Sequence, residues 1–396
     1  MRPALELAGH VEAVPLVDHH VHGAFRADVP RARFENALNE GSTEPLPDFV
    51  SGFDSQLGFA VRRWCAPLLD LEPHAPADTY WSRRAELGEA EVTRRFLTAA
   101  GVSDWVVDTG FGAADVLSVA EIRGLTGAPT HEVVRLEAIA ANVLAEGGEQ
   151  YADRFRGALS DAVARGAVGA KSVLAYRTGF DIDWAVPADA VVRHAAERWA
   201  AAGEDRRLTE PVLIAFGIHA AVEAGLPLQL HVGFGDRDLD LHRTNPMLLL
   251  PFLRQAAVGR VPVLLLHCYP YEREAGYLAQ AFGNVYLDVG LALNYLGARA
   301  RALVARSYEM APFAKVLYSS DAWGPAELHY LGARLWRTAV TGVFGEWVEA
   351  GEWSLDDARR VVDLSAQVNA RRVYRIDPPV PDIPASPPLL SERTRP

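Results

Sequence analysis

The sequence has few cysteines, no long hydrophobic run and no excess of positive charge. Its two cysteines, Cys65 and Cys268, cannot build a disulfide framework, which excludes a small disulfide-stabilised fold and favours a reducing, cytoplasmic location. The longer apolar runs, such as Val261–His267, are far shorter than the ~20 residues that span a bilayer, so we expect no membrane segment. The first eighteen residues contain acidic side chains and no continuous apolar stretch, which argues against a secretory signal.

The shortage of positive charge narrows the range of partners. The 39 Lys and Arg residues are outnumbered by 51 Asp and Glu, for a net charge of −12, which argues against binding to nucleic acids or to an anionic membrane. Disorder is excluded for most of the chain, because 49% of its 396 residues are hydrophobic and can form a core. The composition therefore favours a folded, soluble protein and by itself names no partner; the small-molecule substrate that we expect follows from the motifs below.

Short apolar segments alternate with amphipathic, helix-forming stretches such as Glu149–Arg165 and Leu213–Ala224. Strand, helix, strand, helix is the pattern of parallel strands joined by right-handed crossovers. Eight such units make the (β/α)₈ TIM barrel, an α/β fold, which is our prediction for residues 1–376 as a single domain. The predicted strands are Leu16–His20, Trp105–Thr109, Val133–Ile139, Val168–Ala175, Pro227–Val232, Val261–His267, Val285–Val289 and Lys315–Ser320.

Two segments do not fit this repeating unit. Residues 23–91 are too long for one strand-to-helix connection and contain their own helical patterns, so we expect a helical insertion over the barrel mouth. Residues 377–396 contain seven prolines and are expected to form an extended or disordered tail.

The first predicted strand ends in Asp18-His19-His20-Val21-His22. Side chains two residues apart on a strand point to the same face, so His20 and His22 project together, while His19 points to the other face in a packing or supporting role. Active sites of TIM barrels lie at the C-terminal ends of the strands. A pair of imidazoles at such an end is suited to binding zinc or a related divalent metal.

Three more ligand-type side chains end predicted strands. His231 ends the fifth strand, His267 ends the sixth, and Asp321 follows the eighth. One polar residue at a strand end needs only water or a helix cap as its explanation, but the whole set favours a metal site. These residue types suit zinc, manganese or iron, and their spacing does not choose among the three metals.

Polar residues around the fourth predicted strand add candidates for a second metal and for the substrate. Burying the charged amine of Lys171 at an inward-facing position costs free energy unless the amine is paired or modified. It could be carboxylated and bridge two metals, contact substrate, or pair with a buried carboxylate such as Glu137. Arg177 has a planar fork suited to a substrate carboxylate, although many such arginines belong to structural ion pairs, and Tyr176 precedes it.

Together these motifs resemble the amidohydrolase superfamily, specifically its amidohydrolase-related branch, which also contains decarboxylases. The similarity is greater to the amidohydrolase-like half of nodulin/glutamine synthetase-like fusion proteins and their fungal FluG relatives. It extends from Val14 to about Ile376. The segments that carry it are Val168–Gly179, Leu230–Leu241, Leu265–Pro270, Tyr286–Ala292, Ser319–Trp323 and Tyr330–Arg334.

The resemblance implies that His20, His22, His231 and Asp321 bind one or two catalytic divalent ions, with zinc the first choice. Whether Lys171 and His267 are metal ligands stays open, because family members that bind one metal and members that bind two differ at the lysine. A homo-oligomer is also in keeping with the family. Because the fusion relatives carry an additional glutamine synthetase-like domain, their substrate need not be shared by this chain.

The expected activity is hydrolysis of an amide or other C–N bond by a metal-activated water. Asp321 would transfer the proton and His267 would polarise the carbonyl, making these two the catalytic residues. Arg177, Tyr176, Glu137, Trp323 and Asp236 are the candidates for contacts to a carboxylate-bearing substrate. The alternatives are a metal-dependent decarboxylase on the same scaffold and, less in keeping with the full ligand set, a non-catalytic scaffold protein.

Overall fold

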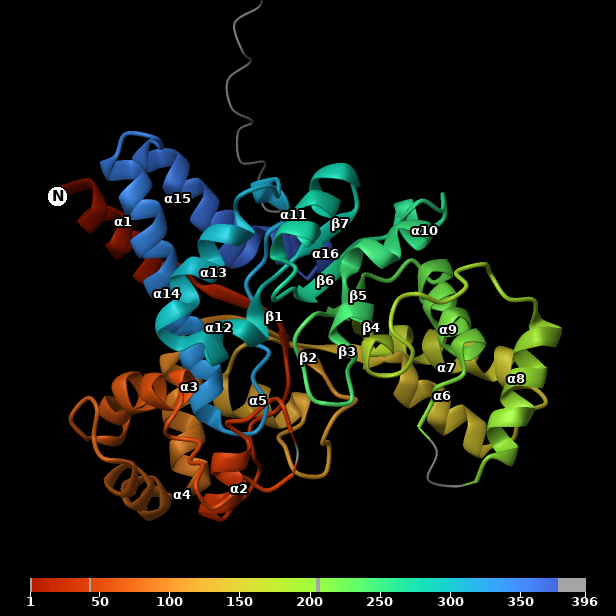
Figure 1. Cartoon of the computed structure of the whole chain (residues 1–396), viewed down its shortest axis with the longest axis horizontal. Coiled ribbons are helices and arrows are strands. Elements are labelled where there is room, and N and C mark those ends of the chain that lie inside the picture. The colour runs from red at the N-terminus through yellow and green to blue at the C-terminus, as the bar shows by residue number, and fades with distance from the viewer. Residues whose placement is uncertain (1, 43, 204–206, 377–396) are drawn as a thin grey trace, which may run out of the picture.

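The protein, studied as a computed structural model, is described for residues 2–42, 44–203 and 207–376 (Figure 1). The described residues contain seven parallel strands that form one curled sheet in sequence order. The strands are β1 (Leu16–Val21), β2 (Val102–Asp108), β3 (Thr130–Arg135), β4 (Ala167–Ser172), β5 (Leu228–Val232), β6 (Val263–His267) and β7 (Val285–Leu287). The α/β class and the parallel sheet therefore agree with the sequence prediction.

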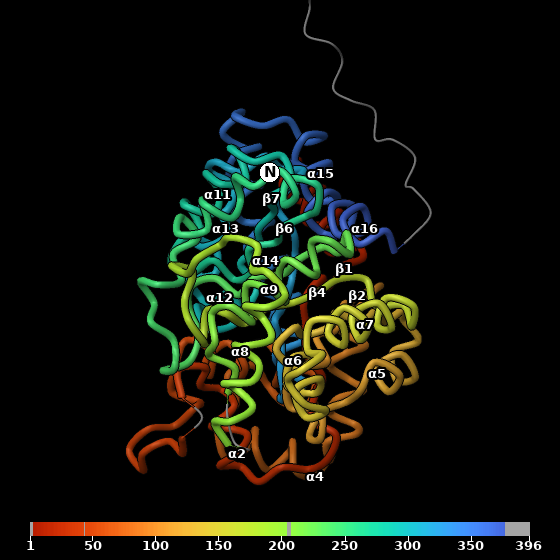
Figure 2. Tube along the Cα trace, turned by 90° about the vertical axis from the view of Figure 1, so that its right-hand side faces the viewer, coloured from red at the N-terminus to blue at the C-terminus, as the bar shows by residue number. Residues whose placement is uncertain are grey.

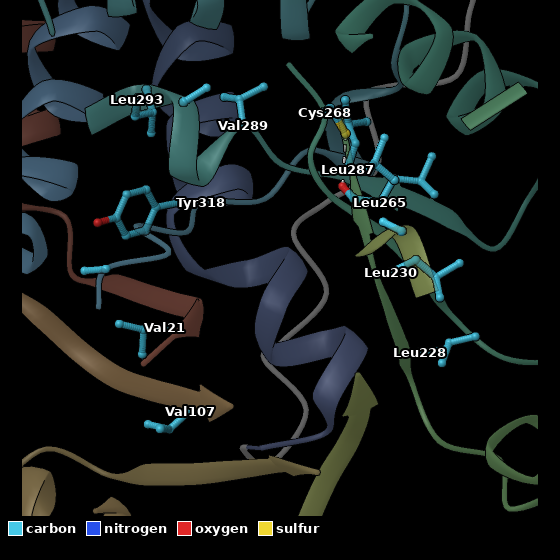
Figure 3. Packing of buried hydrophobic residues seen from close by; sticks show 14 of the residues in the cluster. Val21, Val107, Leu228, Leu230, Leu265, Cys268, Leu287, Val289, Leu293 and Tyr318 are labelled. Atoms are coloured by element: carbon cyan, nitrogen blue, oxygen red, sulfur yellow. Dashed lines mark hydrogen bonds between the residues drawn. The ribbon is translucent and has the colours of Figure 1, made fainter. Parts of the chain in front are cut away.

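Alternating side chains divide the core into two layers. Leu228 and Leu230 of β5 pack beside Leu265 of β6 and Leu287 of β7 in a large apolar layer (Figure 3). The intervening positions of β6 belong instead to a smaller cluster, which also takes residues from β1–β3 and from the last helix. Because neighbouring residues of a strand point to opposite faces, the large layer lies under the helices and the small cluster lies inside the curl.

The predicted eighth strand, Lys315–Ser320, is not a regular strand in the structure. Val316 forms an isolated parallel bridge with Leu287 of β7, and on the other side the backbone of Tyr318 accepts a hydrogen bond from His19 of β1. The segment therefore lies between β7 and β1. Leu317 still donates to the carbonyl of Leu287, but the N–H of Tyr318 donates to the carbonyl of Ser365 and is lost to a ladder with β1.

Helices alternate with these strands. They are α1 (Arg2–Ala13), α2 (Arg31–Asn36), α3 (Gln56–Ala60), α4 (Ala77–Ala99), α5 (Val119–Thr126), α6 (Leu136–Ala145), α7 (Tyr151–Ala164), α8 (Asp189–Ala201), α9 (Pro211–Glu223), α10 (Leu250–Leu253), α11 (Glu272–Ala281), α12 (Gly290–Leu296), α13 (Ala300–Ser307), α14 (Ala326–Glu349), α15 (Leu355–Asp363) and α16 (Asn369–Tyr374). Two strands, β3 and β4, end at least three residues earlier than predicted. β3 ends at Arg135 because the following Leu- and Ala-rich residues favour α6, and β4 is followed by a 3₁₀ turn at Leu174–Tyr176.

The segment between β1 and β2 contains α2, α3, a π-helical turn at Val61–Cys65, a 3₁₀ turn at Ala66–Leu69 and α4. These helices lie together at the lower left of Figure 1, whereas α6–α9 lie at the right. At the upper left of Figure 1 α1 packs against α14 and α15, and Figure 2 shows the N-terminus at the same end of the molecule as α15. The predicted Pro-rich tail, residues 377–396, lies outside the described residues. Within the described ranges, no helix has both the length and the apolar character needed to cross a membrane.

Candidate metal centre

The first strand brings three histidines into the interior of the sheet. The pairing of β1 with β2 shifts register between Asp18 and Val21, so the strict alternation of side chains is interrupted there. As a result His19 also lies in the interior, where its ring contacts Tyr374, and His20 lies next to Lys171. The sequence prediction that His19 faces away from His20 did not anticipate this irregularity.

The ring orientations of His20 and His22 are set by hydrogen bonds on their far sides. His20 Nδ1 donates to Oε1 of Gln229 over 2.8 Å, and His22 Nδ1 donates to the backbone oxygen of Asp108 over 3.0 Å. Because both partners accept, each ring carries its proton on Nδ1, and its Nε2 is unprotonated and can act as an acceptor or a metal ligand. Metal-binding histidines are commonly oriented in this way.

Asp321 meets these two nitrogens. Its Oδ1 lies 3.0 Å from Nε2 of His20 and 3.5 Å from Nε2 of His22. One ligand atom from each of the three residues lies within 4.8 Å of the other two. The structure therefore brings together His20, His22 and Asp321, three of the ligands expected from the sequence.

His267 approaches the same carboxylate from the sixth strand. Its Nε2 lies 3.4 Å from Oδ2 of Asp321, and its backbone N–H donates to Asp288. By strand alternation His267 would point outward with Leu265, but its φ of 71° turns the side chain toward the site. Asp321 also has a positive φ, 48°. Each such residue costs about 1–2 kcal/mol of backbone strain, a cost that is concentrated at functional sites.

Burial controls the charges of the group. It lowers the pKa of His20 to about 3 and that of His267 to about 4, so both imidazoles are neutral at pH 7. Burial alone would raise the pKa of Asp321, but His267 and His20 outweigh it and hold the pKa well below its usual range. Burial lowers the pKa of Lys171 to about 8, although Asp321 and Asp108 oppose that shift. At pH 7 the centre therefore presents neutral imidazoles at His20 and His267, an ionised Asp321 and a largely protonated Lys171.

These donors fit a divalent cation. His20 Nε2 and Asp321 Oδ1 are both acceptors, and they face each other over 3.0 Å without a shared proton. Asp321 Oδ1 and both ring nitrogens of His267 are buried and have no hydrogen-bond partner among the described residues. Opposed lone pairs are unfavourable unless a cation lies between them, and imidazole with carboxylate is a donor set that zinc and related metals prefer.

Two expected ligands stand apart from the group of three. His231 lines the same cavity, and its ring centroid is 4.6 Å from that of His267. However, its Nε2 lies 3.0 Å from both the carbonyl of Phe234 and the hydroxyl of Tyr176. Lys171 is buried, and its Nζ donates to Nε2 of His20 over 3.2 Å, so it neither pairs with Glu137 nor points away from the site.

A cavity of about 430 Å³ opens above the centre. The predicted substrate residues Tyr176, Arg177, Trp323 and Asp236 line it. Glu137 does not: it lies in the first turn of α6, where its carboxylate accepts hydrogen bonds from the Ser172 hydroxyl and the Val173 N–H. Because β3 ends at Arg135, Glu137 lies on α6 and not on the strand where the sequence pattern predicted it.

Several functional residues were missed by sequence reasoning. Gln229 and the backbone of Asp108 orient the two histidines, while Arg135, which pairs with Asp108, and the aromatic residues Phe25 and Phe111 line the cavity. Gln229 could have been found, since it precedes His231 by two residues and shares its face. Phe25 and Phe111 carry no comparable signal, because they lie in loops and meet Trp323 only in the fold.

The chain is similar to known proteins over most of its length. The family described as Amidohydrolase matches residues 138–376. Protein fluG of Emericella nidulans is 32% identical over 410 aligned residues, which cover 93% of this chain and 46% of that protein. The chain thus spans about half the length of this curated relative.

Solved structures are similar over nearly the whole chain. A Lactobacillus casei protein, provisionally assigned as a metal-dependent hydrolase, is 27% identical with a TM-score of 0.82, covering 93% of this chain and 97% of its own. Uronate isomerase of Thermotoga maritima is 16% identical with a TM-score of 0.60, covering 94% and 97%, and this likeness concerns the fold alone.

Proposed function

The chain belongs to the amidohydrolase family, and on this basis we propose that it hydrolyses an amide or related C–N bond of a small, carboxylate-bearing substrate. The observation that carries the proposal is the convergence of two unprotonated imidazole nitrogens on the ionised Asp321 at the base of a cavity. The family and the Lactobacillus casei structure support a metal-dependent hydrolase. The bond and the substrate are our inference.

His20, His22 and Asp321 would hold the ion, for which zinc is our first choice and manganese or iron the alternatives. When bound, a divalent cation acts as a Lewis acid and makes water a nucleophile at neutral pH. Asp321, ionised at pH 7, would accept the proton of the attacking water and return it to the leaving amine. His267, whose ring nitrogens have no described hydrogen-bond partner, would donate to the developing oxyanion.

Arg177 is the cavity residue best suited to a substrate carboxylate. The other arginines of the cavity wall are paired, as Arg135 is with Asp108 and Arg207 with Asp238. Within the described ranges Arg177 has no acidic partner; it donates only to the backbone of Tyr176, and its buried Nε is unpaired. Buried cationic groups normally have partners, so a ligand carboxylate would complete this site.

The other residues of the cavity wall would determine which substrates fit. We propose that Tyr176, Trp323 and Asp236 contact it, as their place in the cavity allows, and that the helices between β1 and β2 cover the mouth. A cavity of about 430 Å³ is in the size range of small-molecule sites. Glu137 is not among the proposed substrate contacts, because its carboxylate accepts hydrogen bonds from Ser172 and Val173.

The number of ions depends on Lys171. Three ligands converge on one position, and His231 is held by Phe234, so we propose one tightly bound ion. A carboxylated Lys171 bridging a second ion is the alternative, and the lowered pKa of its amine would favour that reaction.

The function is tested by metal analysis together with product analysis. Metal-replete protein is expected to contain one equivalent of a divalent ion and to release amine and carboxylic acid from a panel of N-acylated amino acids and related amides. Two equivalents would instead support a carboxylated Lys171. Release of CO₂ without amine would contradict hydrolysis and favour the decarboxylase.

Replacing Arg177 tests the carboxylate contact. Arg177→Met is expected to raise KM about 10- to 100-fold on whichever panel member is turned over, with a smaller change in kcat, because charged hydrogen bonds contribute about 1.5–3 kcal/mol. Steady-state kinetics on that substrate and on its methyl ester give the comparison. The ester should be affected little, and an equal loss on both compounds would show that Arg177 does not read the carboxylate.

A further inference from the structure

A chain of buried polar side chains runs beneath the metal centre and ends at Tyr374, in the last described helix, α16. Gln229 of β5 is its central member and is fully buried. Its Oε1 accepts from Nδ1 of His20 over 2.8 Å. Its Nε2 donates to the backbone oxygen of His19 over 2.9 Å and to the hydroxyl of Tyr374 over 2.8 Å. One amide thus connects a proposed metal ligand on β1 to the backbone of its neighbour His19 and to Tyr374 of α16.

These contacts permit one orientation of the amide. A backbone carbonyl can only accept a hydrogen bond, so the Gln229 atom that faces the carbonyl of His19 is the nitrogen. The atom facing His20 is then the oxygen, which can only accept. His20 must therefore carry its proton on Nδ1, and its Nε2 lone pair faces Asp321.

Tyr374 extends the same logic toward the other side of the centre. Because its oxygen accepts from Gln229, its own proton is directed to Nδ1 of His19, 3.1 Å away. Nε2 of His19 then donates to Asp288 over 3.0 Å, and the second oxygen of Asp288 accepts the backbone N–H of His267 over 2.9 Å. The protons along the whole chain have one consistent arrangement.

The apolar surroundings make it unfavourable in free energy to bury these polar side chains. The interior cluster around Tyr374 is otherwise apolar and includes Val17, Leu264 and Val373. Buried polar groups among such residues are tolerated only when each is hydrogen-bonded, and a partly satisfied network is worse than an apolar core.

We propose that Gln229, anchored by Tyr374, is a positioning residue that sets the tautomer and ring orientation of His20 for metal binding. The last helix of the described chain, α16, is then part of the metal site although none of its residues touches the ion. This inference rests on the proposed metal centre.

The test compares metal affinities of purified full-length variants. Tyr374→Phe removes one oxygen atom and the anchor of Gln229, and Gln229→Leu removes the contact to His20. Tyr151→Phe is the matched control, because Tyr151 is equally buried and its hydroxyl has no partner among the described residues. Zn²⁺ affinity is measured by competition with a chromophoric chelator, and ligand geometry by the visible absorption of Co²⁺-loaded protein.

Tyr374→Phe is expected to weaken Zn²⁺ binding about tenfold and Gln229→Leu up to about 100-fold, the usual range for groups that orient a ligand. Both should alter the Co²⁺ spectrum, and Tyr151→Phe should match the wild type in both measurements. Thermal unfolding is recorded in parallel, since a merely structural role would lower the melting temperature without changing the affinity or the spectrum of the folded protein.

Two outcomes separate this inference from the proposed function. If the wild type binds Zn²⁺ and Tyr374→Phe binds it as tightly as Tyr151→Phe with the same Co²⁺ spectrum, the positioning role is wrong and the metal centre stands. If the wild type binds no Zn²⁺, the metal centre itself is wrong. Should Gln229→Leu not fold, Tyr374→Phe decides the question.

Discussion

The double variant His20→Ala/His22→Ala is expected to lose stoichiometric divalent-metal binding, with an affinity more than about 100-fold below that of the wild type. The reason is that these residues supply two of the three converging donors, so their loss should exceed the 10- to 100-fold effect of groups that merely orient ligands. Elemental analysis after equilibration with Zn²⁺, followed by a chelator competition, measures the loss. Turnover should disappear with the metal.

A buried histidine elsewhere is the control for this result. His219 of α9 is buried, and its Nε2 donates to the backbone of Trp184 over 3.0 Å, away from the cavity. His219→Ala should therefore cost stability but keep one equivalent of metal. A double variant that still bound one tight equivalent and turned over substrate would refute the assignment of His20 and His22.

Asp321→Asn is expected to reduce kcat at least about 10³-fold, since the amide can neither accept the proton nor supply the charge of the carboxylate. The fold should survive, because asparagine keeps the side-chain shape and tolerates the left-handed backbone at this position, where φ is 48°. Steady-state kinetics of metal-loaded protein and thermal unfolding measure the two effects. The melting temperature should stay within a few degrees of the wild type.

Glu40→Gln is the comparison for this variant. Glu40 is half-buried and lines the same cavity, and burial, with Asp321 and Asp236 adding to the effect, raises the pKa of its carboxyl to about 8. The group is therefore largely neutral at pH 7, and its amide should have a much smaller effect on kcat than that of Asp321. Similar losses in both variants would mean that a general change of charge in the cavity, and no specific role of Asp321, limits the rate.

The regular part of the fold was readable from local patterns. Apolar segments with strand-ending polar residues located β1, β2, β5 and β6 to within a few residues, because burial on both faces leaves a strong signal. The predicted strands were wrong where another conformation or another hydrogen-bond partner competed with the strand pattern. Helix-forming residues after Arg135 ended β3 early, and a hydrogen bond from Tyr318 to Ser365 broke the ladder of the expected eighth strand.

The site was predicted in outline for a similar reason. Carboxyl ends of parallel strands meet at one edge of a sheet, so residues that end different strands converge without further information. That rule predicted that His20, His22 and Asp321 lie together, whereas His267 reaches Asp321 through its left-handed backbone. It could not show that Phe234 holds His231 or that Glu137 turns away from the cavity.

The scarcity of cysteine, of positive charge and of long apolar runs, together with the strand-end residues, was enough to indicate a metal-dependent α/β enzyme. Those features depend on residue type and on strand periodicity, and both are local. Only the tertiary structure determined the orientation of the side chains at the candidate metal centre. The left-handed backbone at His267 and the register shift in β1 redirect side chains, and the Gln229–Tyr374 hydrogen bond joins residues 145 positions apart. Such geometry is imposed by packing and hydrogen bonding between distant elements, so no local pattern contains it.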